Sequence, residues 1–327
     1  MSKVLVTGAS GFLGSNLVQV LLAAGHEVVA TKRTTSRIDH LSDFNIHWKD
    51  AALEDLNSLI AAFKDADAVF HCAAVVSYWH GDSAAMCSAN VQGTHNVIEA
   101  VRQAKVKRLI YCSSVDALGL PEKGSLGNEE SVWNWDQHGF DFAYPRTKFE
   151  SEKLVLAARD INAVIVNPTF MLGPNDPKPS SGRLTLSVAK GWGLAYPSGK
   201  NNFVDVRDVC SGMLLAWQKG KRGERYILGG ENLSYAEVFS KIAKVAGVRR
   251  PIFAIPKVLA QIGGLLGDAI SLFTRKDPSI TSQSTVLSYI DHVYSSEKAR
   301  LDLDYQSRSI EHAIEDSLTW FKDYNYL

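Results

Sequence analysis

Tyr144 and Lys148 stand four residues apart at the start of a segment with helical periodicity, so their side chains share one face of the expected helix. A free tyrosine has a pKa of about 10 and is a poor proton donor or acceptor at neutral pH. A lysine one turn away, together with the positive charge of an oxidised nicotinamide, stabilises the phenolate and brings the tyrosine into working range. The spacing therefore indicates acid–base catalysis by Tyr144, although many surface helices carry Tyr-x-x-x-Lys by chance.

Two serines, Ser113 and Ser114, follow an apolar strand-like run that ends at Cys112. Ligands of open parallel sheets bind at the carboxyl ends of the strands. A serine hydroxyl in that position can hydrogen-bond a substrate carbonyl oxygen and share its polarisation with the tyrosine. One of the two serines is expected to cap the end of the strand instead.

A glycine-rich turn joins the first apolar run to the first segment of helical periodicity. It reads Thr7-Gly8-Ala9-Ser10-Gly11-Phe12-Leu13-Gly14, with a glycine at every third position. One glycine allows a sharp turn, one lets the backbone approach a pyrophosphate, and one lets helix and strand pack closely. The phosphates then meet the positive end of the helix. This position between a strand and an amphipathic helix favours a dinucleotide-binding loop over a purely structural turn.

Arg33 follows the second apolar run, at the position where an NAD site usually carries an acid for the ribose 2′-hydroxyl. The chain has no acid there until Asp39, and Lys32 and Arg37 flank the arginine. A guanidinium fits a 2′-phosphate, to which Ser10 could add a hydroxyl. The sequence therefore favours NADP(H), with NAD(H) possible, over a merely solvated basic loop.

Short apolar runs alternate with helical segments through the first half of the chain, which predicts parallel strands joined by right-handed crossovers. The expected fold is a doubly wound parallel α/β sheet, a Rossmann fold. Strands are expected at 4–6, 28–31, 46–48, 68–72, 108–112 and 163–167, and helices at 12–22, 89–103 and 143–158.

The alternation stops at Pro168, and residues 173–182 hold three prolines and two glycines, which are loop residues. We expect a dinucleotide-binding domain over 1–167, with returning segments near 203–229 and 286–296. A smaller, discontinuous substrate lobe takes most of 168–327. An apolar helix around 258–274 is too short and polar to span a membrane, and 258–285 is a candidate lid or partner-facing segment.

The chain has 35 basic and 35 acidic residues, and this balance argues against a nucleic-acid or membrane-surface partner. Its four cysteines form no CxxC pair and indicate buried free thiols of a reducing compartment, without a metal site. The N-terminus enters a strand at once and leaves no room for a signal peptide. We therefore expect a cytoplasmic protein with a small-molecule substrate.

Several motifs together resemble the extended short-chain dehydrogenase/reductases, and most of all the dihydroflavonol-4-reductase-like group. Bacterial NAD-dependent epimerase/dehydratase family members, including hopanoid-associated sugar epimerases, are similar too. The resemblance covers nearly the whole chain in order. It rests on the glycine-rich turn, His-Cys-Ala-Ala at 71–74, Asn-Val-Gln-Gly at 90–93, Cys-Ser-Ser at 112–114, Tyr-Pro-Arg-Thr-Lys at 144–148, Asn-Pro-Thr at 167–169 and Phe-Val-Asp-Val-Arg-Asp at 203–208.

The resemblance implies a catalytic triad of Ser114, Tyr144 and Lys148. It also implies a homodimer formed through the helices at 89–103 and 143–158. The family's Asp-Leu pair after the third strand is Ala52-Leu53 here, and Asp50 is a weak substitute. The implied cofactor contacts are Gly8, Ser10, Gly11, Phe12, Leu13, Gly14, Arg33, Leu53, Ala73, Asn90, Tyr144, Lys148, Asn167, Pro168 and Thr169.

Three reactions compete on this sequence. A nucleotide-sugar epimerase or dehydratase needs cations for the diphosphate. Asn201 stands at the first arginine position, with Lys200 adjacent, and 286–292 contains no arginine, which argues against this reaction. A cofactor-binding sensor without turnover tends to lose the tyrosine or lysine, and both are present. NADPH-dependent reduction of a hydrophobic or aromatic ketone or aldehyde fits best, with a 3β-hydroxysteroid-type dehydrogenase as a variant of the same chemistry.

The expected substrate walls support that choice because they are mostly apolar or aromatic. Asp116 is interpreted as a surface or pocket-rim carboxylate rather than a catalyst. The wall residues are Val76, Tyr78, Leu118 and Phe170, joined more weakly by Trp79 and Trp133.

Overall fold

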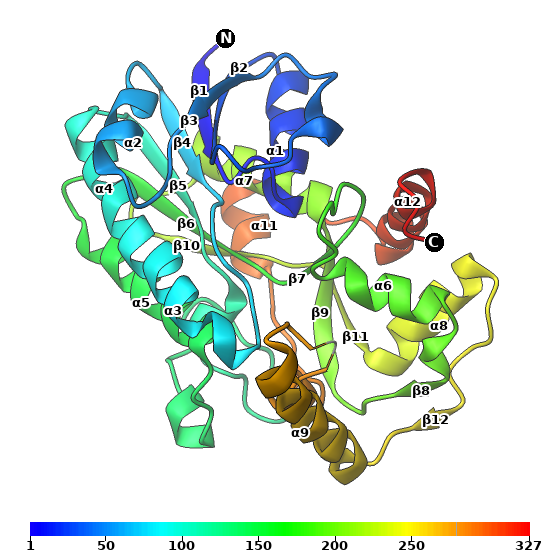
Figure 1. The fold of residues 1–327 in the computed structure, drawn as a ribbon. Coiled ribbons are helices and arrows are strands. Elements are labelled where there is room, and N and C mark those ends of the chain that lie inside the picture. The colour runs from blue at the N-terminus through cyan, green and yellow to red at the C-terminus, as the bar shows by residue number, and fades with distance from the viewer. Residues whose placement is uncertain (279) are drawn as a thin grey trace.

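The computed structural model describes residues 1–278 and 280–327. Its centre is a seven-stranded sheet in the order β10-β6-β5-β4-β1-β2-β3, and every neighbouring pair is parallel (Figure 1). The strands are β1 (Lys3–Thr7), β2 (Glu27–Lys32), β3 (His47–Asp50), β4 (Ala68–His71), β5 (Arg108–Cys112), β6 (Ala163–Pro168) and β10 (Arg225–Leu228).

Helices cover both faces of this sheet, because its strands are short runs rich in Val, Ile and Leu that must be buried on both sides (Figure 1). On one face pack α1 (Phe12–Ala23), α7 (Val206–Lys219) and α11 (Glu297–Leu303). On the other pack α2 (Leu56–Phe63), α4 (Gly93–Gln103) and α5 (Ala143–Ala157). The predicted doubly wound α/β fold is confirmed.

A second lobe is built around β9 (Lys200–Asp205), which pairs with three short strands. These are β7 (Phe170–Leu172), β11 (Glu231–Ser234) and β13 (Asp291–His292), while β8 (Ala195–Tyr196) pairs with β12 (Phe253–Ala254). Its core lies among α6 (Gly182–Ala189), α8 (Tyr235–Ala246) and α12 (Ile310–Asp323). The lobe also carries α9 (Lys257–Thr274) and α10 (Ser282–Leu287).

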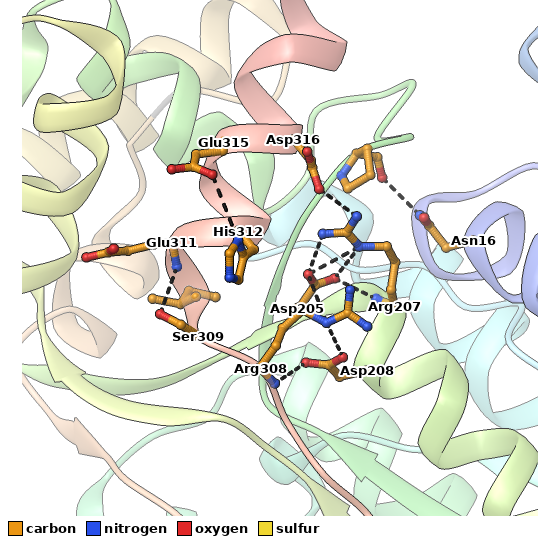
Figure 2. Close-up of polar contacts among 12 residues, drawn as sticks. Asn16, Asp205, Arg207, Asp208, Arg308, Ser309, Glu311, His312, Glu315 and Asp316 are labelled. Carbon is orange, nitrogen blue, oxygen red and sulfur yellow. Dashed lines mark hydrogen bonds and ion pairs between the residues drawn. The ribbon is translucent and has the colours of Figure 1, made fainter.

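The Asp-Val-Arg-Asp part of the 203–208 motif has a structural role at the junction of the two lobes (Figure 2). Asp205 is fully buried and is the N-cap of α7, because its side chain accepts a hydrogen bond from the backbone N–H of Arg207 in the first turn of this helix. The Arg207 guanidinium bridges Asp205, at 2.6 Å, to Asp316 of α12, at 2.6 Å. Arg308 donates to Asp208. The motif therefore fastens α12 to the helix that covers the main sheet.

Two of the expected elements differ from the structure. The helix expected at 89–103 begins earlier, as α3 (Ser83–Met86) followed by a π-helical turn over Cys87–Gln92 and then α4. The segments near 203–229 and 286–296 were expected to return to the dinucleotide-binding domain. Residues 203–205 and the strand at 291–292 belong to the second sheet instead. Only α7 and β10 of these segments join the main sheet and its helices. Short 3₁₀ turns lie at Asp39–Leu41, His80–Asp82, Val115–Ala117, Trp135–His138 and Trp192–Leu194.

The cysteines are all free thiols, and the prediction that they are buried is wrong for two of them. Cys112 and Cys210 are buried, Cys72 is half-buried and Cys87 is exposed. The candidate lid over 258–285 consists of α9 and α10, and its residue 279 lies outside the described residues. In the described part of the chain, no helix is both long enough and apolar enough to cross a bilayer.

Candidate active site

The glycine-rich turn has the shape that the sequence predicts. Gly8 has a φ of +71°, and a Cβ there would lie 2.7 Å from the Ala73 backbone. A Cβ on Gly14 would lie 2.2 Å from the Gly8 carbonyl oxygen. Gly11 is the N-cap of α1 and supplies no side-chain cap, so the first N–H groups of this helix are free to bind an anion. The turn therefore fits the pyrophosphate of a dinucleotide.

Gly14 and Gly263 both lie inside helices, and only Gly14 is crowded, which makes them a matched pair for substitution. We expect Gly14→Ala to cost about 1–3 kcal/mol of unfolding free energy and to weaken dinucleotide binding, because the methyl group forces the turn away from α1. Gly263→Ala meets nothing within 4 Å and should stabilise the chain by about 0.5–1 kcal/mol. Urea unfolding and cofactor titration of both variants measure this difference, and equal effects would contradict it.

His71, at the end of β4, is hydrogen-bonded to the start of the glycine-rich turn. Its Nδ1 lies 2.7 Å from Thr7 Oγ1 and its Nε2 3.2 Å from Thr94 Oγ1 of α4. Thr7 Oγ1 also accepts a hydrogen bond from the Ala73 N–H, at 3.3 Å. Burial, together with the nearby Lys148 ammonium, lowers the pKa of His71 to about 3. The imidazole is therefore neutral and ties β1, β4 and α4 together under the cofactor turn.

The lowered pKa of His71 makes stability depend on pH. Its folded pKa of about 3 lies below its ordinary value of 6.5, so the unfolded chain takes up the proton first as the pH falls. The stabilisation is complete above pH 6.5 and is lost between pH 6.5 and 3, by up to about 1.4 kcal/mol per pH unit. Urea unfolding at several pH values should show a shallower dependence for His71→Gln than for wild type. The exposed His47→Gln should keep the wild-type slope, and parallel slopes for all three proteins would refute this role.

Arg33 lies exposed just beyond the carboxyl end of β2, and it makes no ion pair with any described residue. Its neighbour Lys32 is engaged with Asp50, at 2.7 Å, so Asp50 is occupied by the protein itself. Leu53 packs over Gly93, and its carbonyl accepts from Asn96. Arg33 and Arg37 are both exposed cations without an ion-pair partner among the described residues, and Arg33 is the one next to the end of β2.

Ser114, Tyr144 and Lys148 are all buried at the carboxyl end of β5. Lys148 Nζ donates to the Cys112 carbonyl at 2.8 Å and lies 5.3 Å from the centre of the Tyr111 ring. The Ser114 hydroxyl oxygen accepts the Asp116 N–H at 3.1 Å, which leaves its own O–H free to donate. The structure thus brings the predicted catalytic residues together.

Burial raises the pKa of Tyr144 to about 12, and it outweighs the Lys148 charge and the Ser114 hydroxyl, which both lower it. The expectation that the lysine and an oxidised nicotinamide together bring the tyrosine into working range is therefore not met by the lysine alone. Burial by itself would lower the pKa of Lys148, but the nearby tyrosines raise it and the ammonium keeps its charge. At neutral pH the pair is a phenol beside a cation.

Asp116 is buried, at 7 % exposure, so its interpretation as a surface or rim carboxylate is wrong. One of its oxygens accepts the Tyr78 hydroxyl at 2.9 Å, and the other lies 3.8 Å from Nδ1 of the buried His292. The Tyr78 ring packs edge-on against Tyr144, with centroids 5.7 Å apart. Burial lowers the pKa of His292, more than Asp116 raises it. A polar network from two lobes therefore adjoins Tyr144.

Asn90 lies in the π-helical turn and bridges two elements of the site. Its Oδ1 accepts the Val75 N–H at 2.8 Å, and its Nδ2 donates to the Val75 carbonyl at 2.9 Å and to Thr147 Oγ1 at 3.1 Å. Both amide protons are used by the protein. Asn90 thus ties the segment after β4 to α5, the helix that carries Tyr144 and Lys148.

The Asn167–Thr169 segment lies at the carboxyl end of β6, with its side chains turned into the protein. Asn167 Nδ2 donates to the Ser114 carbonyl at 2.9 Å and to Glu152 at 2.8 Å. Thr169 donates to Asn202 of β9, and Pro168 is the last residue of β6. Glu152, which sequence reasoning missed, stands one turn after Lys148 on α5, a spacing that could have revealed it. Neither His292 nor Asn202 had such a signal.

The predicted substrate walls do not form one surface. Leu118 is fully buried in a cluster with Val115, Ile227 and Tyr294, so its assignment to a wall is wrong. Phe170 packs edge-on against Phe203 in the second lobe, and Val76 is 57 % exposed. Trp133 stacks on Phe149, and Trp79 bonds to α9. Of the aromatic residues among them, Tyr78 is the one whose ring packs against the Tyr144 ring in the described structure.

Asn201 and His292 face each other across β9 and β13 as register partners. These strands contain the position and the segment where a diphosphate site would need arginines. A neutral amide and a buried imidazole with a lowered pKa offer no fixed cation there.

Comparison with known proteins agrees with this geometry. The model of the family described as "NAD dependent epimerase/dehydratase family" matches residues 4–229. A Synechocystis sp. protein provisionally named dihydroflavonol 4-reductase is 33 % identical, over 98 % of this chain and 95 % of its own. The sterol demethylase protein B of Methylococcus capsulatus is 35 % identical over 98 % of both chains. The crystal structure of gox2253 covers 100 % of both chains with a TM-score of 0.87 and 34 % identity.

Proposed function

Because this chain belongs to the NAD dependent epimerase/dehydratase family and is an extended short-chain dehydrogenase/reductase, we propose that it reduces a small-molecule ketone or aldehyde with NADPH. The substrate is a hydrophobic or aromatic compound. The observation that carries the proposal is the convergence of Ser114, Tyr144 and Lys148 at the end of β5, with the serine O–H free to donate and the lysine fixed on the Cys112 carbonyl.

The glycine-rich turn, Arg33 and Lys148 are the groups that would hold NADPH. The backbone of Gly8, Gly11 and Gly14 and the first turn of α1 take the pyrophosphate, and Arg33 takes the 2′-phosphate. The Lys148 ammonium would hydrogen-bond the ribose next to the nicotinamide. When bound, NADPH supplies the hydride that reduces the carbonyl carbon.

The protein's own groups handle the carbonyl oxygen. Ser114 donates a hydrogen bond to it and polarises the C=O bond. Tyr144 passes its phenolic proton to the oxygen as the alcohol forms, a role that suits a phenol with a pKa of about 12, since it keeps its proton at neutral pH. The Lys148 ammonium then stabilises the phenolate that remains.

A nucleotide-sugar substrate is disfavoured by the Asn201–His292 pair, because a buried diphosphate at this place would lack a guanidinium partner. A 3β-hydroxysteroid-type dehydrogenase remains the second candidate. It uses the same chemistry on a hydrophobic alcohol, and the name of the Methylococcus relative, sterol demethylase protein B, favours it.

The test is an absorbance assay of cofactor oxidation with a panel of aromatic ketones, aliphatic aldehydes and steroid ketones, run with NADPH and with NADH. We expect turnover with NADPH on part of this panel. Absence of turnover on all carbonyls, together with conversion of a UDP- or dTDP-sugar, would overturn the proposal and establish the epimerase or dehydratase alternative.

A further inference from the structure

Helix α9 is amphipathic, but it presents its apolar face to solvent rather than to the protein. Its small and polar side chains face the protein, whereas its large apolar side chains face outward. A surface helix normally buries its apolar stripe against the core. The outward residues, each between 49 % and 89 % exposed, are Val258, Leu259, Ile262, Leu265, Leu266, Ile270, Leu272 and Phe273.

Specific contacts fix the helix in this orientation. A Cβ on Gly264 would lie 2.3 Å from Thr285 Oγ1, and one on Gly267 would lie 2.0 Å from the Ile280 carbonyl oxygen, so α9 lies tightly against the α10 segment along its glycines. Asp268 accepts the Ser282 N–H, and Ser271 Oγ accepts the Trp79 indole N–H at 3.0 Å. Rotating the helix to bury its leucines would break all of these contacts.

The apolar face extends beyond the helix and stands at the edge of the molecule (Figure 1). Ile252 and Phe253, just before α9, are 69 % and 57 % exposed, and Ile280 after it is 55 % exposed. Single exposed apolar residues are ordinary, but so many of them along one helix and its two flanks indicate an interaction site.

Cations flank this patch at both ends. Arg249, Arg250 and Lys257 precede or begin the helix, and Arg275 and Lys276 follow it. All five are exposed, and none forms an ion pair with a described residue. The two acids of the same stretch are engaged, because Asp268 bonds to Ser282 and Asp277 pairs with Arg183 at 3.0 Å. The patch therefore presents an apolar centre between positive ends.

We propose that α9 docks on an anionic lipid bilayer, lying in the plane of the interface with its leucines and phenylalanine among the acyl chains. An apolar stripe with flanking lysines and arginines is the pattern that binds such surfaces. This proposal departs from the expectation that the balanced net charge excludes a membrane-surface partner, because the field that the lipid meets is the local one, which the five exposed cations beside the patch set.

A second copy of the chain is a poorer occupant of the same face. In a two-fold pairing through α9 each patch would meet itself, and the flanking cations of one copy would lie near those of the other without intervening acids. Such like-charge contacts oppose association. Anionic headgroups instead complement both ends of the helix.

Docking at α9 would bring the bilayer next to the candidate active site. Trp79, which bonds to Ser271 of α9, directly follows Tyr78, whose ring packs against Tyr144. Gln283 of α10 bonds to His80 on the same segment, at 3.3 Å. The docking proposal does not depend on which reaction the site performs, and its test needs no substrate.

The experiment is co-sedimentation of the full chain with vesicles of phosphatidylcholine and phosphatidylglycerol, and with phosphatidylcholine alone. We expect binding to the anionic vesicles that weakens as salt rises. The double variant Ile262→Glu with Leu266→Glu should bind roughly tenfold less or worse, because two charges enter the apolar face. Leu301→Glu, at a site 75 % exposed on α11, is the matched control and should bind as wild type.

Replacing Arg275 and Lys276 with glutamine should reduce binding to the anionic vesicles, and thermal melting should be unchanged in all variants because every substituted side chain is exposed. Three results would overturn the proposal. In the first, the wild type fails to sediment with anionic vesicles, and in the second the double glutamate variant binds them like wild type. In the third, vesicle binding is absent and sedimentation velocity shows a wild-type dimer that the double variant disrupts.

Discussion

Tyr144→Phe is expected to lower kcat by about 10²–10⁴-fold while cofactor affinity and the melting temperature stay near their wild-type values. The variant removes one hydroxyl from a ring whose packing against Tyr78 needs no hydroxyl. The carbonyl oxygen then loses its proton donor, while Ser114 and the cofactor turn keep their geometry. Steady-state kinetics with the best carbonyl of the panel, together with an NADPH titration, separates these effects.

Tyr324→Phe makes the same chemical change at an exposed position beyond α12 and should leave kcat unchanged. A Tyr144→Phe enzyme that retains most of its kcat would exclude Tyr144 as the proton donor. A fall in cofactor affinity of the same size as the fall in kcat would instead assign Tyr144 to binding.

The main sheet was predictable because its strands are buried on both faces and therefore appear as continuous apolar runs. The strand at 108–112 has the predicted bounds for this reason. The start of the 89–103 helix was not predictable in the same way. The π-helical turn there is accompanied by the bonds of Asn90 to Val75 and Thr147, which join segments far apart in the sequence. Local periodicity contains no trace of such partners.

In the candidate site too, residues close in the sequence were predictable, whereas contacts between distant segments were not. Tyr144 and Lys148 are one helical turn apart, so their spacing alone placed them together. The contact of Asp116 with His292 depends on how the second lobe folds back, and the sequence offered no means of pairing them. Leu118 was wrongly assigned to the substrate wall, because an apolar residue close to a site in sequence can equally belong to the hydrophobic core.

Helix α9 shows a limit of reading amphipathicity from sequence. Periodicity identifies an apolar face but not the side on which the protein lies, and the usual assumption buries that face. Here the glycines at 264 and 267 decide the matter, because close approach to the α10 segment is possible only along them. The structure, rather than the hydropathy, therefore turns the leucines outward.

Arg33→Ala is expected to weaken NADPH binding by about 10–100-fold and to leave NADH binding nearly unchanged, because a charge-assisted hydrogen bond to the 2′-phosphate contributes about 1.5–3 kcal/mol. Arg33 is chosen for this contact because it is exposed, has no ion-pair partner among the described residues and directly follows β2, whereas Lys32 is held by Asp50 and Arg37 lies farther along the loop. Fluorescence titration of each variant with both cofactors gives the ratio of dissociation constants directly.

Arg37→Ala is the matched control, since it removes an exposed arginine from the same loop. It should change the NADPH to NADH ratio far less than Arg33→Ala, because residue 37 lies farther along the chain from the end of β2, where the ribose of a bound dinucleotide is recognised. A wild-type protein that binds NADH more tightly than NADPH would contradict the assignment. An equal loss for both cofactors in Arg33→Ala would mean that the arginine serves the fold of the loop rather than the 2′-phosphate.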